Sequence, residues 1–270
     1  ITAVVILAFP PVFWLMRAEI LSPRDDAGLA ASLYVAACIP FAIVYAYLTL
    51  IRYFRRPPAC VVSESTRTLD LWPELGGKLV GDGKGQAVTR WPGNGVFTFD
   101  ITDLTLKVPN LPPELDGLAL LLLSDLHFHG TPSRLYFERI LGELASGPTP
   151  DVVCLAGDFL DSDRHHHWIG ELLGPLRANC AKFAILGNHD LYHDPDRARA
   201  ELAAAGYTVL GNGWQEITIR GVPCVVVGHE GPWFGPPPDL TAAPAGPFRL
   251  CVSHTPDNFY WGVANKIGLM

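Results

Sequence analysis

The chain has 270 residues, of which 49% are apolar and 17% are charged, and its formal net charge is −7. This composition excludes a disordered protein, and the length excludes a small scaffold that depends on disulfides. The 20 basic residues, against 27 acidic ones, form no run that would neutralise a phosphate backbone, so no nucleic-acid partner is expected.

Two apolar stretches at the start of the chain account for its high mean hydropathy. Residues 28–51 run for 24 residues without a charge, about 36 Å as a helix, which is long enough to cross a membrane. A buried core helix is the alternative, but core helices seldom stay uncharged for so long. Residues 1–16 are also uncharged and are interpreted as a second span that is cut off at its start. We therefore expect residues 1–51 to form a membrane anchor of two transmembrane helices, a multi-pass arrangement.

The basic residues around the second stretch bear on its orientation. Arg52, Arg55 and Arg56 follow it, whereas Arg17 and Arg24 lie in the loop before it. By the positive-inside rule, this count favours a cytoplasmic position for the rest of the chain. The cysteines form no C-x-x-C pair and no disulfide-like framework, and no N-x-[ST] sequon occurs, which agrees with that side.

Residues 52–95 are polar and contain many glycines and prolines, which is typical of a juxtamembrane linker or a small hairpin. The GDGKG sequence in this segment suggests a phosphate-binding loop. However, Lys78 stands where that motif requires its first glycine, and Gly85 stands where it requires serine or threonine. We therefore assign no chemistry to this segment.

From residue 96 onward, apolar runs of strand length alternate with segments of helical periodicity. The apolar runs are residues 118–124, 152–156, 181–186, 222–227 and 248–253. Apolar residues at helical spacing are Phe137, Ile140, Leu141 and Leu144, then Ile169, Leu172, Leu173 and Leu176, and more weakly Ala198, Leu202 and Ala205. This alternation predicts an α/β domain whose sheets are covered by helices.

Residues with carboxylate, amide or imidazole side chains follow four of these predicted strands. The strands lead into Asp125-Leu126-His127, into Gly157-Asp158 with Asp161, into Asn188-His189-Asp190, and into Ser253-His254. The carboxyl ends of strands in an α/β sheet form the usual ligand crevice, so these side chains are expected at one rim. Oxygen and imidazole ligands without thiolate suit Mn, Fe or Zn.

Two divalent ions about 3.5–4 Å apart are a common device for phosphoester chemistry. At that distance they repel each other by roughly 19 kcal/mol even at an effective dielectric constant of 20, so an anion must lie between them. Asp158 follows a glycine that permits a sharp turn, and we choose it as the bridging ligand.

The motifs D-x-H, G-D-x-x-D, G-N-H-D and S-H, in this order, resemble those of the calcineurin-like metallophosphoesterases, particularly a membrane-associated branch with SDLH and SH-x-PD. Each motif alone is weak, but four in order, each at the end of a predicted strand, form a specific pattern. The resemblance covers residues 96–270. It implies a four-layer α/β/β/α sandwich of two mixed sheets flanked by helices.

The resemblance also implies roles for individual residues. Asp125 and His127 would hold one metal ion, Asp158 would bridge, and Asn188 and His254 would hold the second ion. His189 would be the catalytic histidine, oriented by Asp190, and Asp161 would support the ligands from behind. The implied reaction is in-line attack on phosphorus by a hydroxide between the two metals.

One motif of the resembled family is not found in this sequence. The family pattern closes with G-H-x-H, whose two histidines complete the metal site, and residues 265–270 resemble the segment that precedes it. We therefore expect a domain that is incomplete at its C-terminal end, with full activity in doubt for the sequence as it stands.

Several other residues are weaker candidates for the site. His129 lines the pocket or is a solvated loop histidine, and the tract of residues 165–167 faces the surface or a substrate in preference to a metal. His229 and Glu230 end a strand and are candidates for substrate contact. Trp233 lies on a proline-rich segment that is either a lid over an apolar substrate or a plain connector. Asn212 is interpreted as a turn residue.

Two functions of different classes follow from these observations. The first is a membrane-anchored phosphohydrolase with two divalent ions, acting on a phosphodiester, phosphomonoester or pyrophosphate of a small molecule or a lipid. The second is a non-catalytic membrane-bound binding or regulatory module that keeps the fold. The adjacent His189 and Asp190 favour the enzyme, because a scaffold has no chemical need for them.

Overall fold

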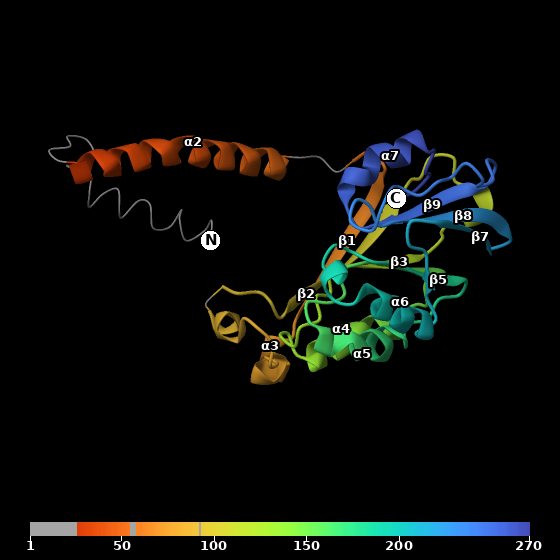
Figure 1. Cartoon of the computed structure of the whole chain (residues 1–270), viewed down its shortest axis with the longest axis horizontal. Coiled ribbons are helices and arrows are strands. Elements are labelled where there is room, and N and C mark those ends of the chain that lie inside the picture. The colour runs from red at the N-terminus through yellow and green to blue at the C-terminus, as the bar shows by residue number, and fades with distance from the viewer. Residues whose placement is uncertain (1–25, 55–57, 92) are drawn as a thin grey trace. The chain divides into compact units, whose positions relative to one another are not determined.

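The computed structural model describes residues 26–54, 58–91 and 93–270. Their contacts divide the chain into two compact units, residues 1–59 and 60–270. In the first unit, helix α2 (Asp26–Phe54) contains Pro40, and its part Ser32–Phe54 is long and apolar enough to cross a membrane (Figure 1). The other expected span, residues 1–16, lies outside the described residues.

The second unit is a mixed α/β structure with three sheets, as the alternating pattern predicts at the level of fold class. Strands β3 (Leu120–Leu123), β4 (Val152–Ala156), β5 (Ala181–Ile185) and β6 (Thr208–Val209) form a parallel sheet in that order. In the second sheet, β7 (Trp214–Ile219) runs antiparallel to β8 (Val222–His229), and β9 (Phe248–Ser253) runs parallel to β8. Strands β1 (Val61–Asp70) and β2 (Thr98–Leu106) form an antiparallel pair.

The side chains of β4 alternate between two separate apolar cores, as the period of two in a strand requires. Val153 and Leu155 pack with the helices on one face, and Val152, Cys154 and Ala156 pack with the second sheet on the other. All five are buried, which explains why the strand is apolar throughout. The opposite face of the second sheet packs against Trp261 and neighbouring loop residues.

The three helical periodicities are confirmed in position. They correspond to α4 (Arg134–Ser146), to the short α5 (His166–Trp168) with a π-helical continuation over Ile169–Leu173, and to α6 (Pro195–Ala204). Figure 1 shows α4, α5 and α6 grouped on one side of the parallel sheet. A further helix, α7 (Phe259–Ala264), follows β9. Short 3-10 turns occupy Gly76–Leu79, Gln86–Arg90, Pro113–Leu115, Asp163–His165, Asp190–Tyr192 and Pro256–Asn258.

Much of the segment that we expected to be a linker or hairpin, residues 52–95, belongs to the second unit, which begins at Cys60. Strand β1 pairs along its length with β2, and the short α3 (Trp72–Leu75) follows it. Leu71 and Leu79 are buried in a small cluster with Ile140 of α4. Strand β1 itself is exposed at most positions on both faces, so its sequence carries no alternating apolar pattern.

Candidate metal centre

The loops that follow β3 and β4 meet through backbone hydrogen bonds. The N–H of Asp125 donates to the carbonyl of Gly157 at 3.0 Å, and that of His127 donates to the carbonyl of Asp158 at 3.0 Å. Asp125, His127 and Asp158 all have positive φ angles, between 45° and 57°. Such conformations cost roughly 1–3 kcal/mol each for residues other than glycine, and they gather where a structure holds functional side chains.

Two glycines permit this close approach. A Cβ atom on Gly187 would lie 2.2 Å from Oδ1 of Asp158, and a Cβ atom on Gly157 would lie 2.3 Å from the backbone nitrogen of Gly187. Both distances are far shorter than any real contact. The glycines of the G-D-x-x-D and G-N-H-D motifs therefore let the β4 and β5 loops touch, and they leave room for the Asp158 carboxylate.

The predicted ligands form two groups that share Asp158. One group contains His127, Asp158 and His189, and the other contains Asp125, Asp158 and His254; within each, the ligand atoms lie within 4.8 Å of one another. Nε2 of His127 lies 3.7 Å from Oδ1 of Asp125 and 3.8 Å from Oδ2 of Asp158. Asp125 therefore lies near both groups, whereas the motif resemblance assigns it to the His127 side.

The contacts of His254 fix the direction in which its ring presents a lone pair. Its Nδ1 donates to the backbone carbonyl of Ala156 at 2.7 Å, since a carbonyl can only accept. Its Nε2 lies 3.1 Å from Oδ1 of Asn188 and 3.3 Å from Oδ2 of Asp158. Three acceptor atoms thus converge on one point, an arrangement that needs a cation or a proton between them.

His254 and Asp158 shift each other's pKa values. The hydrogen bond to Asp158 is the main cause that raises the pKa of His254, against the opposing effect of burial. Burial by itself would raise the pKa of Asp158, but hydrogen bonds from His254 and from the backbone of His189 lower it below its usual value. The donor set of His254, Asn188 and Asp158 fits a divalent cation.

Asp161 contacts both histidines of the other group. Its Oδ1 lies 2.6 Å from Nδ1 of His189 and 3.2 Å from Nδ1 of His127. Burial raises the pKa of Asp161, but these hydrogen bonds outweigh burial, so the pKa is lowered overall. Each histidine thus donates from Nδ1 to one carboxylate oxygen, which leaves its Nε2 free to face a metal or a phosphoryl group.

Asp190 does not orient His189, which corrects the expectation from the sequence. Its side chain is fully buried and points the other way, where its oxygens accept four backbone N–H groups at 2.9–3.1 Å. The donors belong to Asp158, Phe159, Leu160 and Gly187. The carboxylate therefore shapes the β4 loop that carries Asp158, and Asp161 takes the orienting position.

The weaker candidates lie outside both groups. His129 is half-buried and its Nδ1 contacts the carbonyl of His127 at 2.9 Å. His229 is buried, packs edge-to-face on Trp261, and its Nδ1 accepts from Gly231 and Asn258. Trp233 is half-buried, with its ring 5.7 Å from that of His254, so it lies beside the metal ligands.

Two further candidates, His166 and Glu230, are buried and bonded to other parts of the protein. In the histidine tract, which we expected to face the surface or a substrate, His166 is completely buried, and its ring nitrogens contact the carbonyls of Asp163 and His193. Glu230 is also buried and pairs with Arg199. Neither residue belongs to the groups of possible metal ligands.

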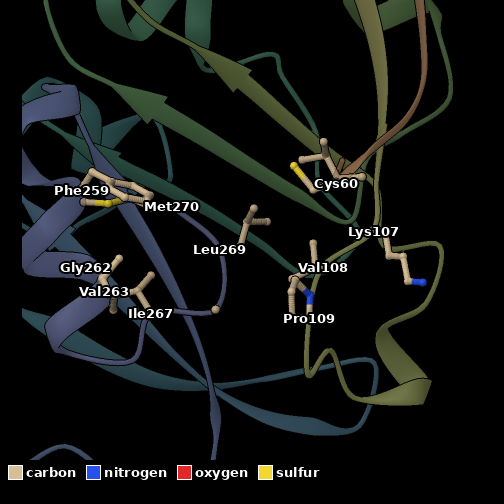
Figure 2. Close-up of a pocket in the computed structure, with 12 residues that line it drawn as sticks. Cys60, Lys107, Val108, Pro109, Phe259, Gly262, Val263, Ile267, Leu269 and Met270 are labelled. Carbon is tan, nitrogen blue, oxygen red and sulfur yellow. The ribbon is translucent and has the colours of Figure 1, made fainter. Parts of the chain in front are cut away.

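A separate apolar pocket of about 270 Å³ lies between the end of β2, helix α7 and residues 267–270 (Figure 2). Its wall includes Cys60, Leu106, Phe259 and Met270. None of the predicted site residues lines it. The pocket is therefore distinct from the metal centre.

Comparisons with known proteins agree with the geometry. The family model for calcineurin-like phosphoesterases matches residues 118–258, just over half of the chain. A transmembrane protein with metallophosphoesterase domain from Danio rerio is 36% identical over 93 residues, covering 34% of this chain and 21% of that protein. UDP-2,3-diacylglucosamine pyrophosphatase LpxG from Chlamydia trachomatis is 34% identical over 97 residues, covering 33% of this chain and 28% of that protein.

The matched segments thus span less than a third of the length of these two relatives. Among solved structures, a protein of unknown function from Aquifex aeolicus aligns with a TM-score of 0.26 and 16% identity, covering 41% of this chain and 60% of that one.

Proposed function

The chain belongs to the calcineurin-like phosphoesterase family, and from this premise we propose that it is a membrane-anchored phosphohydrolase with two divalent metal ions. The observation that carries the proposal is the pair of ligand groups that share Asp158. Asp125 and His127 would hold one ion, Asn188 and His254 would hold the other, and Asp158 would serve both. The ions, Mn, Fe or Zn, would supply a water of lowered pKa and positive charge for the phosphoryl oxygens.

The protein's own groups then divide the remaining work. His189, held by Asp161, directs its Nε2 toward the phosphoryl group and protonates the leaving oxygen. The loop geometry set by Asp190 keeps the bridging carboxylate in place. The carbonyl of Ala156 holds His254 in the tautomer that a metal requires, with the proton on Nδ1.

The substrate we propose is a phosphodiester, phosphomonoester or pyrophosphate of a small molecule or a lipid. The name of the chlamydial relative, a diacylglucosamine pyrophosphatase, supports a lipid-linked pyrophosphate. Helix α2 and the name of the zebrafish relative support a membrane location. We also propose a helical hairpin over residues 1–51, a four-layer sandwich over residues 96–270, and a cytoplasmic position for the catalytic domain.

The test is hydrolysis of bis(p-nitrophenyl) phosphate by the full-length protein with Mn²⁺, followed by a panel of lipid pyrophosphates and nucleotide sugars. We expect turnover that requires the metal and is lost in Asp158→Asn and His189→Ala. If both variants keep wild-type turnover, the site assignment is wrong. If metal binds and no ester is cleaved, the non-catalytic binding module is the better account.

A further inference from the structure

A buried ion pair joins three elements close to the metal centre. Glu230, directly after β8, is only 1% exposed, and its carboxylate receives both Nη1 and Nη2 of Arg199 on α6, at 3.0 and 2.5 Å. Its Oε1 also accepts the backbone N–H of Leu186, at the end of β5, at 2.7 Å. Such a fork-to-carboxylate pair fixes orientation as well as distance.

The same pair holds the loop that follows Glu230. The Arg199 guanidinium lies over the ring of Phe234, 5.3 Å from its centroid, a cation–π geometry. Asn212 accepts the N–H of Glu230 at 2.7 Å and donates to the carbonyl of Phe234 at 3.0 Å. The loop is thus fixed on both sides of Trp233, by the guanidinium of Arg199 and the side-chain amide of Asn212.

Trp233 therefore has a defined position beside the metal ligands. Its ring meets that of His254 edge-to-face, with centroids 5.7 Å apart, and the residue as a whole is half-buried. A half-buried indole next to a phosphoryl-binding site can offer a planar apolar surface to the group that the phosphorus carries.

We infer that Arg199, Glu230 and Asn212 are positioning residues that hold Trp233 as one wall of the substrate site, and that this wall selects phosphate compounds carrying a planar or apolar group next to phosphorus. The inference rests on the proposed function and deepens it by naming a substrate class. Trp233 touches the substrate, whereas the other three residues act through it.

Calorimetric binding of two non-hydrolysable ligands to the Mn²⁺-loaded full-length protein tests this inference. Phenylphosphonate and methylphosphonate share the phosphorus group and differ in the planar ring. We expect phenylphosphonate to bind about tenfold more tightly, the ratio that one aromatic contact supplies. Trp233→Ala should bring the ratio close to one.

The positioning role is tested by residues that do not reach the ligand. Arg199→Met and Asn212→Ala should lower the ratio about as much as Trp233→Ala does. Arg197→Met, an exposed arginine on the same helix, is the matched control and should leave the ratio unchanged. Because Arg199→Met leaves Glu230 buried without its charge partner, Arg199→Lys serves if that variant does not fold, since it keeps the charge and loses the fork.

The outcomes separate this inference from the proposed function. If neither ligand shows metal-dependent binding, the proposed function fails and the inference fails with it. If both ligands bind and Trp233→Ala leaves the ratio of their affinities unchanged, Trp233 does not select the substrate and the proposed function stands. If Trp233→Ala lowers the ratio but Arg199→Lys and Asn212→Ala do not, the positioning role is overturned.

Discussion

The two groups of possible metal ligands differ in how the fold holds them. In the group with His127 and His189, the imidazoles are 30% and 46% exposed, and both depend on one carboxylate, that of Asp161. In the group with His254, the imidazole is only 8% exposed, and a backbone carbonyl together with Asn188 fixes it. His254 is therefore held within the core, whereas His127 and His189 are held at the surface; Asp125, in the group with His254, is itself 59% exposed.

This difference leads us to expect unequal responses to mutation. Changes to the shared Asp158 should affect both halves, and changes to the exposed half should leave the buried half able to bind metal.

Asp158→Asn should impair metal binding in both groups, because both lose their shared ligand. We expect turnover to fall by roughly 10³-fold or more, the scale of removing a preorganised electrostatic contact from an active site. Metal content should fall below one ion per chain, as measured by mass spectrometry of the dialysed protein. Asp196→Asn, an exposed aspartate in the first turn of α6, is the control, and an equal loss there would contradict the role of Asp158.

His189→Ala should show whether His189 binds a metal ion or acts on the substrate. The geometry groups His189 with His127 and Asp158, whereas the motif resemblance gives it a catalytic role. We expect a loss of about 10³-fold in kcat, typical of general acid catalysis, with metal content unchanged. Loss of one metal ion in this variant would make His189 a ligand instead.

Asp190 should reveal how the loop beneath both halves is stabilised. Burial raises the pKa of Asp190 from 3.8 to about 6, although its backbone hydrogen bonds oppose the rise. The folded protein therefore holds this proton more tightly than the unfolded chain does. The resulting stabilisation is complete below pH 3.8 and is lost as the pH rises through about 6, a change of about 3 kcal/mol.

Urea unfolding of the metal-free protein and of Asp190→Asn measures this effect. The difference in unfolding free energy, wild type minus variant, should fall as the pH rises from 3.8 to 6, since only the wild type titrates at this position. The Asp196→Asn difference should stay flat. A difference that rises over the same range would show that the ionised carboxylate is the stabilising form.

Asp161→Asn should weaken only the exposed half. The amide oxygen can still accept from His127 and His189, but without the negative charge it holds their rings less firmly, so we expect turnover to fall by about 10–100-fold. The affinity for the metal at His254 should not change, which a Mn²⁺ titration measures. A variant that loses both metals would show that the two halves are not independently held.

The periodicities in the sequence sufficed for the strands and helices that position the site. The apolar run of residues 152–156 matches β4, and the spacing of Phe137, Ile140 and Leu141 places a helix where α4 occurs. These patterns succeed because burial on one or both faces dictates them. Strand β1 was not predicted because few of its side chains are buried.

The partners within the site were harder to predict than its members. His189 and Asp190 are adjacent, yet their side chains point to different loops, so sequence adjacency misidentified the orienting acid. The link from Glu230 to Arg199 also crosses between elements and has no local signature. The only sequence signal for Asp161 was its place in G-D-x-x-D, and its contact with two histidines required the fold.

Electron paramagnetic resonance of the Mn²⁺-titrated full-length protein shows whether Asp158 bridges two metal ions. We expect two ions per chain with an exchange-coupled spectrum, which Asp158→Asn abolishes. One ion per chain, or two ions without coupling, would contradict the bridging role of Asp158.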